Sequence, residues 1–217
     1  AVEECLEAIE ELDPTLGAWQ EVYAEEARAA ARIADAEVSS NRRKGPFHGV
    51  PFALKDIVEV EGKRTAAGCF EWKDRQSTMT AEVAQRLIDA GGILLGKTKT
   101  VEFAMGGWGT NQRMGTPHNP WDKNVARTPG GSSSGSGVSV ASGMVPCAIG
   151  TDTGGSVRLP AAFCGIAGLK TTEGLLPTSG IVPLSHTLDT PGPMARSVAA
   201  VAVMFDALVG GPTGVDL

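Results

Sequence analysis

The 217-residue sequence has one tyrosine, three histidines and four cysteines, and aromatic residues make up only 5% of it. So few aromatic side chains argue against an aromatic binding surface. No CxxC pair occurs and the histidines are far apart, so the sequence indicates no zinc site, and no other metal or cofactor is expected. The four dispersed cysteines are typical of free thiols in a reducing compartment, and we therefore expect a cytoplasmic protein.

Long hydrophobic runs are also lacking, since none approaches the ~20 residues needed to span a bilayer. The first 13 residues are acidic and amphipathic, unlike a secretory signal. The formal charge is −6 and no basic face stands out, which argues against direct binding of nucleic acid. The composition therefore predicts a protein that binds neither membranes nor nucleic acid directly.

The remaining composition, 42% hydrophobic and 20% charged, is that of an ordinary globular domain. Asp13-Pro14 is expected to stop the first helix, and Thr80 is expected to cap the third. Helices are expected over residues 2–12, 18–37, 80–90 and 197–209, and strands over 49–60 and 93–96. Strands and helices alternate, so the sequence predicts an α/β fold.

Glycine is abundant, with 28 residues in the whole sequence, and the glycines are densest between Gly106 and Gly180. The segment 130–156 could be a flexible Gly/Ser linker, but hydrophobic, strand-like sequence follows it directly. Two glycines before Ser156 allow successive backbone N–H groups to point into one concavity that binds an anion. Such a concavity can act as an oxyanion hole, which would place Ser156 to attack a carbonyl group.

A serine hydroxyl needs a base before it becomes a good nucleophile. The three histidines lie in no recognisable motif. Lys55 lies among apolar residues in FALKD, and burial would lower the pKa of its ammonium group so that it could accept a proton directly or through a second serine. The alternative, a strand lysine that reaches the surface, remains open on composition alone.

Several separate motifs, in order, resemble those of the amidase signature family. They are GVPFALKD, GGILLGKTKTVEFAMG, NPWD, GGSSSGSGVSVASGMVPCAIGTDTGGSVRLPAAFCGIAGLK and SHTLDTPGPMARSV. The resemblance extends from Gly49 to Val209. It implies an α/β fold with a mixed central sheet flanked by helices on both faces. It also implies hydrolysis of a small-molecule carboxylic or carbamoyl amide through an acyl-enzyme.

The resemblance implies a Ser–cis-Ser–Lys triad in which Ser156 is the nucleophile, Ser132 relays the proton and Lys55 is the base. The bond between Gly131 and Ser132 would then be a cis peptide, which is rare outside proline. The family pattern also implies roles for neighbouring residues. The backbone amides of Thr153, Gly154, Gly155 and Ser156 would line the oxyanion hole, and Met105 would line the substrate channel. The supporting residues would be Ser133, Asp152 and Arg158, with Asp152 and Arg158 paired through their side chains.

Two residues depart from the family pattern, Ser134 where glycine is usual and Thr171 where proline is usual, and neither belongs to the triad. Family members are about twice as long as this chain. We therefore expect one domain over 1–217, with a helical segment over 1–44 and a catalytic core over 45–217, that represents the N-terminal half of the family fold. The other half would lie in a longer form of the chain or in a partner chain, and a homodimer is a further expectation.

Two other interpretations of the motifs compete with this one. Residues 91–98 fit the phosphate-loop pattern GxxxxGK[ST], but Ile93–Leu95 is strand-like and a helix precedes it. Residues 131–135 fit a GxSxG nucleophile elbow with Ser133 as nucleophile and His186 with Asp152 or Asp189 as partners. An elbow opens a helix, and VSVASGMVP is poor helix sequence, so the elbow is the weaker hypothesis.

Two functions besides amide hydrolysis remain. The chain could be the glutaminase component of a tRNA-dependent amidotransferase, which uses the same triad but passes ammonia to an acceptor on a partner. It could also be an inactive fragment or interaction module. The sequence does not indicate which amide is the substrate.

Overall fold

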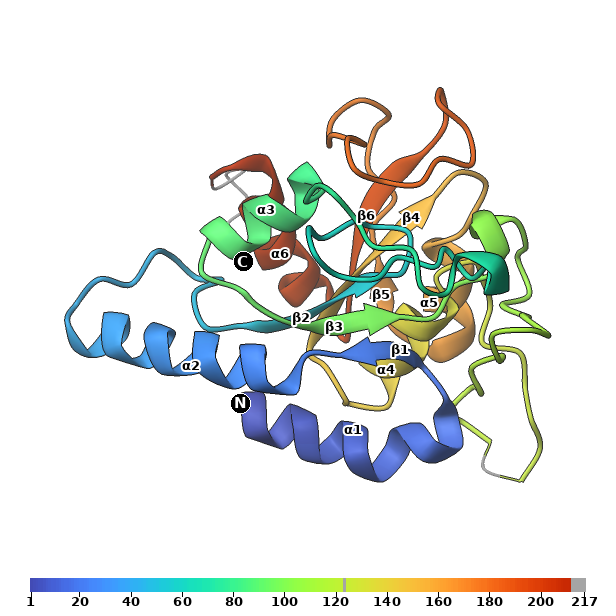
Figure 1. Cartoon of the computed structure of the whole chain (residues 1–217), viewed down its shortest axis with the longest axis horizontal. Helices are drawn as coiled ribbons and strands as arrows, with labels where there is room; N and C mark the ends of the chain where they lie inside the picture. Colours follow the sequence, from blue (N-terminus) through green and yellow to red (C-terminus); the bar gives the residue numbers. More distant parts are fainter. Residues whose placement is uncertain (123, 212–217) are drawn as a thin grey trace.

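A mixed six-stranded sheet forms the centre of the computed structural model, which describes residues 1–122 and 124–211. The order of the strands is β1-β3-β2-β4-β6-β5 (Figure 1). Their bounds are β1 (Trp19–Val22), β2 (Pro51–Lys55), β3 (Ile93–Thr98), β4 (Cys147–Asp152), β5 (Ala167–Gly168) and β6 (Thr190–Ala195). β2 pairs in parallel with β3 and β4, whereas β1, β6 and β5 pair antiparallel with their neighbours.

Helices cover both faces of this sheet, which confirms the predicted α/β fold. α1 and α2 lie together on one side, and α3 and α6 lie on the other (Figure 1). Their bounds are α1 (Val2–Leu16), α2 (Ala24–Ser39), α3 (Glu82–Asp89), α4 (Ser134–Ala141), α5 (Arg158–Cys164) and α6 (Val198–Val209). Short 3-10 helices cover Phe70–Trp72 and Glu102–Ala104.

Alternation along the strands builds two hydrophobic cores. In β2, Phe52 and Leu54 pack in the core formed with α3 and α6, while Ala53 packs in the core formed with α1, α2 and α4. Ile149 and Ala148 of β4 divide in the same way. Successive strand side chains point to opposite faces, so a central strand buried on both faces is apolar throughout. This is why the neighbours of Lys55 are apolar.

The N-terminal region differs from the sequence prediction. The expected stop at Asp13-Pro14 is wrong, because α1 continues through Pro14 to Leu16. The left-handed backbone of Gly17 (φ 61°), the next residue, directs its N–H to the carbonyl of Asp13. The helix expected over 18–37 begins only at Ala24, because Trp19–Val22 forms β1 and pairs with β3. Pairing with the sheet therefore outweighs the helix propensity of this alanine-rich segment.

The expected cap at Thr80 is also wrong. The residue before α3 is Ala81, with no side-chain cap, and Thr80 Oγ1 accepts a hydrogen bond from the Glu61 amide instead. The helix expected over 197–209 is confirmed as α6. Ser197 Oγ caps it by accepting a hydrogen bond from the Ala200 amide at 3.2 Å.

α4 is a helix where the sequence favoured none, which removes one argument against the nucleophile elbow. Its residues Ser134–Val140 are all buried. A Cβ at Gly135 would lie 2.5 Å from the Lys99 amide nitrogen and closer still to the Ala18 carbonyl, and one at Gly137 would lie 3.0 Å from Pro160. Close packing of small residues therefore stabilises a helix whose intrinsic propensity is low.

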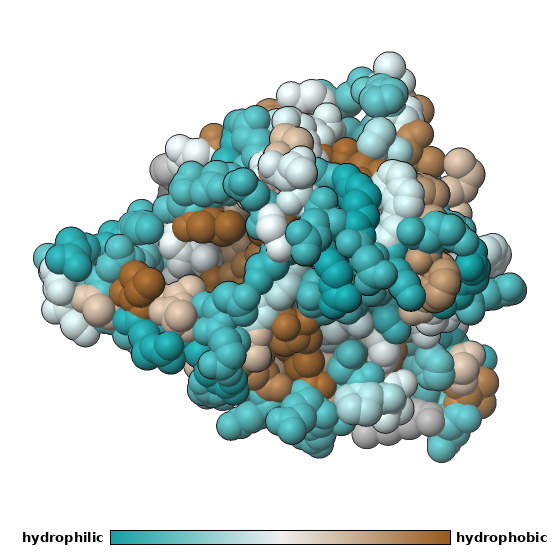
Figure 2. Space-filling model, viewed as in Figure 1, coloured by the Kyte–Doolittle hydropathy of each residue, from teal (hydrophilic) through white to brown (hydrophobic). Residues whose placement is uncertain are grey.

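The phosphate-loop interpretation is wrong, as expected, because residues 93–98 form β3. All four cysteines are buried free thiols, which confirms that expectation. Among the described helices, none has the length and apolar character needed to cross a bilayer. The face seen in Figure 2 is largely hydrophilic, with small separate hydrophobic patches. Residues 212–217 of the expected domain lie outside the described part of the chain.

Candidate functional site

The candidate site lies where parallel strands of the sheet end. Lys55 is the last residue of β2, and Thr151 and Asp152 are the last two residues of β4. β2 and β4 are parallel neighbours, so their carboxyl ends lie at one edge of the sheet. Open α/β sheets commonly bind ligands at this edge.

Lys55 is fully buried, which excludes the surface-lysine alternative. Its Nζ lies 2.7 Å from Ser132 Oγ and 2.8 Å from Thr151 Oγ1. Both partners are neutral hydroxyls, so neither supplies the negative charge that would stabilise a buried ammonium group. Burial lowers the pKa of Lys55 to about 7, although the charges of Asp189 and Asp152 act to raise it. A lysine with this pKa is half neutral near pH 7 and can accept a proton.

The bond between Gly131 and Ser132 is cis, which confirms the prediction. The glycines before Ser132 are required by close backbone contacts. A Cβ on Gly130 would lie 2.8 Å from Pro160, and one on Gly131 would lie 2.5 Å from the Gly109 amide nitrogen. Ser132 itself is completely buried. The close packing of this segment therefore holds the Ser132 hydroxyl beside Lys55.

Ser133 links the two serine-bearing segments. Its amide donates to the carbonyl of Ser156 at 3.3 Å. Its hydroxyl donates to the Thr151 carbonyl at 3.3 Å and accepts from the Thr151 amide at 3.2 Å. The residue after Ser132 is thus tied both to the end of β4 and to Ser156. The supporting role of Ser133 in the reaction stays a prediction.

The Asp152 carboxylate organises the turn that carries Ser156. Oδ1 accepts from the Gly155 amide at 2.7 Å, and Oδ2 accepts from the amides of Val157 and Arg158. The Arg158 guanidinium contacts both oxygens, as predicted. Burial raises the pKa of Asp152, but these donors outweigh it and hold that pKa at about 2. The carboxylate is therefore ionised at neutral pH and fixes the turn.

The amides of this turn do not all match the predicted oxyanion hole. Gly155 donates to Asp152, so its amide is not free to bind an oxyanion, and this part of the prediction is corrected. The amides of Thr153, Gly154 and Ser156 have no hydrogen-bond acceptor within residues 1–122 and 124–211. The sequence placed all four amides in the turn, but it could not show which amide would donate to the Asp152 carboxylate.

Met105 is exposed over 70% of its surface. It lies near the segment around Gly107, whose carbonyl accepts from the Gly131 amide at 2.7 Å. The loop that contains Met105 therefore borders the Ser132 segment. Its role in lining a substrate channel stays a prediction.

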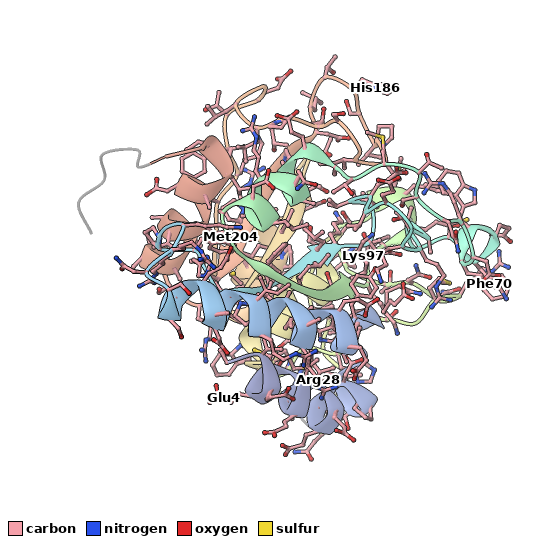
Figure 3. The ribbon with its side chains drawn as sticks, turned by 60° about the vertical axis from the view of Figure 1, so that its left-hand side comes forward. Glu4, Arg28, Phe70, Lys97, His186 and Met204 are labelled. Atoms are coloured by element: carbon pink, nitrogen blue, oxygen red, sulfur yellow. The ribbon has the colours of Figure 1, made fainter. Side chains whose placement is uncertain are left out.

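The structure does not assemble the nucleophile elbow. The Ser133 hydroxyl is bound to the backbone of Thr151. His186 is exposed in a loop and projects away from the body of the protein, whereas Lys97 lies inside it (Figure 3). Asp189 binds Thr153 and its own loop, and Asp152 binds Arg158. No histidine base is therefore placed beside Ser133 within the described residues.

Two contacts at the site were not predicted from the sequence. Thr151 binds Lys55, and the Asp189 carboxylate accepts a 2.5 Å hydrogen bond from Thr153 Oγ1. Thr151 had one available signal, since it ends a strand that could pair beside the strand of Lys55. Asp189 was named only as a possible partner of His186 in the elbow, and its hydrogen bond with Thr153 was not predicted.

Comparison with known proteins agrees with this geometry. The sequence profile described as Amidase matches residues 1–213. The chain belongs to the amidase family. This amidase-family chain is 44% identical over 209 residues to a glutamyl-tRNA(Gln) amidotransferase subunit of Anaeromyxobacter sp. (strain K). It is 42% identical over 207 residues to a 2-amino-5-chloromuconic acid deaminase of Comamonas testosteroni.

These matches cover 96% and 95% of the chain but only 42% and 45% of the two relatives, so the chain spans less than half of their length. Among solved structures, the peptide amidase of Stenotrophomonas maltophilia matches with a TM-score of 0.90 and 39% identity. That match covers 98% of this chain and 44% of the peptide amidase. The structure thus has the fold of the N-terminal half of these amidase-family proteins.

Proposed function

We propose that this chain carries the reacting groups of an amide hydrolase, with Ser156 as nucleophile, Ser132 as proton relay and Lys55 as base. The observation that carries the proposal is the 2.7 Å contact between Lys55 Nζ and Ser132 Oγ. Lys55 is buried, and its pKa of about 7 permits a neutral amine at neutral pH. The bond from the Ser133 amide to the Ser156 carbonyl brings the nucleophile segment next to the relay.

The proposed reaction proceeds in two halves. Ser132 gives its proton to neutral Lys55 and takes the proton of Ser156 as Ser156 Oγ attacks the amide carbonyl carbon. The amides of Thr153, Gly154 and Ser156 stabilise the oxyanion that forms. The C–N bond then breaks, the leaving nitrogen takes the proton back through Ser132, and an ester on Ser156 remains. Water attacks this ester by the same relay and releases the carboxylic acid.

Lys55, Ser132 and Ser156 can be tested with matched variants of the full-length protein. It is incubated with a panel of carboxylic and carbamoyl amides, and release of acid and ammonia is followed by mass spectrometry. We expect Ser156→Ala, Ser132→Ala and Lys55→Ala each to lose roughly 10²-fold or more of the activity. Lys44→Ala, an exposed lysine outside the site, should retain it. Full activity of Lys55→Ala would overturn the assignment of the base.

A second candidate is the glutaminase function of an amidotransferase, favoured by the 44% identity to a component of such an enzyme. It uses the same three residues but delivers ammonia to an acceptor held by a partner. Glutamine hydrolysis that depends on a partner protein would favour it. Hydrolysis of other amides without a partner would favour the first candidate. Absence of any adduct on Ser156 with a fluorophosphonate probe would favour an inactive module.

The substrate pocket is proposed to need residues beyond those described, in the same polypeptide or in a second chain. The support is the length of the relatives, of which this chain covers 42–45%. We therefore propose that the residues described supply the reacting groups, while the choice of amide depends on the rest of the pocket. The amide panel tests this choice directly.

A further inference from the structure

Asp189 lies at the end of the loop before β6 and is bound from three sides. Thr153 Oγ1 donates to its Oδ1 at 2.5 Å, and the Ser185 amide donates to the same oxygen at 3.1 Å. The Leu184 amide donates to Oδ2 at 2.8 Å. The carboxylate is therefore held in one place and joins this loop to the turn that precedes Ser156.

The hydrogen bond between Thr153 and Asp189 lies directly beyond the last residue pair of β4 and β6. Asp152 and Thr190 are register partners in β4 and β6, and Thr190 Oγ1 donates to the Asp152 carbonyl at 2.7 Å. Thr153 and Asp189 are the next residues beyond this pair. Their hydrogen bond therefore extends the pairing of the two strands to the first residue of the turn.

We propose that Asp189 is a positioning residue for amide hydrolysis that fixes Thr153 in the Ser156 turn and directs an unneutralised negative charge toward Lys55. The proposal rests on the proposed function and extends it to a residue outside the three reacting side chains.

The charged groups around Lys55 come from several elements, and most are paired. Asp152 at the end of β4 is paired with Arg158 of α5. Asp56, which follows Lys55, is paired with Lys97 of β3 at 3.5 Å. Within the described residues, Asp189 has hydrogen-bond donors but no cationic partner. Its charge is therefore the least compensated of the three carboxylates.

This charge matters because the proposed reaction places a proton on Lys55. An ammonium group in a dry site is costly unless a negative charge faces it. Asp189 is the larger of the two carboxylate influences that raise the pKa of Lys55 against burial. The carboxylate would thus keep the buried lysine basic enough to accept the proton of Ser132 without holding it permanently charged.

The test uses full-length protein and a fluorophosphonate probe, with the rate of labelling at Ser156 measured from pH 5 to 10. Asp189→Asn removes the charge, and we expect the midpoint of the pH profile to fall by roughly half a unit or more. Thr153→Val removes the tether only, and we expect about tenfold slower labelling with an unchanged midpoint. Asp35→Asn, an exposed carboxylate on α2, should change neither.

A second measurement separates this proposal from the proposed function. The proton affinity of Lys55 is titrated directly by NMR of protein with ¹³Cε-labelled lysine, with the resonance assigned from Lys55→Arg. A lower midpoint in Asp189→Asn supports the role of Asp189 even if wild-type Ser156 is never labelled, in which case only the proposed function fails. Should Asp189→Asn not fold, Asp189→Ser carries the same expectation. An unchanged Lys55 midpoint in the folded variant overturns the proposal.

Discussion

The backbone amide of Ser133 donates a hydrogen bond to the carbonyl oxygen of Ser156 at 3.3 Å. The two residues are 23 positions apart, and each lies at the start of a segment that leads into a helix, α4 or α5. Because the same Ser133 also binds Thr151 through its hydroxyl, one residue aligns both serine segments with the end of β4. Substitutions around Ser133 and Lys55 should therefore change the reactivity of Ser156.

The pH dependence of labelling tests the state of Lys55. Its pKa is lowered to about 7 by burial, so the neutral amine predominates above that pH. If neutral Lys55 is the base, the rate of fluorophosphonate labelling at Ser156 should rise through about pH 7 and then level off. Lys55→Arg should be slow at every pH, because a guanidinium does not deprotonate. A wild-type midpoint near 10 would contradict a buried base.

Thr151→Val tests the second hydroxyl partner of Lys55. Valine keeps the shape of threonine but removes the group that lies 2.8 Å from Nζ. We expect labelling at pH 8 to slow about tenfold, because the amine loses one of its two orienting hydrogen bonds. Thermal unfolding monitored by circular dichroism serves as the control for folding. An unchanged labelling rate would mean that Ser132 alone orients Lys55.

Gly150→Ala tests the position of Ser133. A Cβ at residue 150 would lie 2.7 Å from Ser133 Oγ and 3.0 Å from Met194 Sδ. We expect a destabilisation of about 1–3 kcal/mol in urea unfolding, together with slower labelling of Ser156. Ser133→Ala removes the hydroxyl without crowding and separates the two effects. Normal labelling and stability in Gly150→Ala would show that Ser133 can move freely.

Asp152→Asn tests the turn through stability. The pKa of Asp152 is lowered to about 2 when folded, so its stabilisation is present above the unfolded pKa near 4 and is lost as the pH falls toward 2. We expect the variant to lose about 1–2 kcal/mol of unfolding free energy at pH 7. The difference from wild type should narrow below pH 4. A difference in unfolding free energy that does not depend on pH would mean that the charge of Asp152 is not the source of its stabilisation.

His186→Ala distinguishes the lysine relay from a histidine-based elbow. His186 is exposed, and the Ser133 hydroxyl that it would activate is bound to Thr151. We expect amide hydrolysis and probe labelling to stay within about twofold of wild type. Loss of activity with retained folding would revive the histidine mechanism.

Much of the site could be predicted because its residues lie in contiguous motifs. Lys55, Ser132, Ser156 and the Asp152–Arg158 pair were visible there, and the apolar runs indicated β2 and β3. β1 was missed because its four residues gain their stability from pairing with β3, which local propensity does not report. α4 was missed because its glycines allow contacts with Ala18 and Pro160 that no local sequence pattern reveals.

The contacts of Thr151 and Asp189 were missed for a similar reason, because each joins residues that are far apart in the sequence. The hydrogen bond from Lys55 to Thr151 joins residues 96 positions apart, and that from Thr153 to Asp189 joins residues 36 positions apart. Such pairs become visible only when strand order and register are known. The occupied amide of Gly155 is a local contact, but it depends on which side of the turn the Asp152 carboxylate takes.

The 77-residue separation between Lys55 and Ser132 has a consequence for how the protein reaches its native state. Contacts this distant in sequence form slowly, because a long loop must close before the contact stabilises anything. The lysine can bind its hydroxyl partners only after β2 and β4 have paired. Reactivity of Ser156 during refolding should therefore appear with the last cooperative phase. The time course of covalent labelling would then report when the parallel strands β2 and β4 have paired.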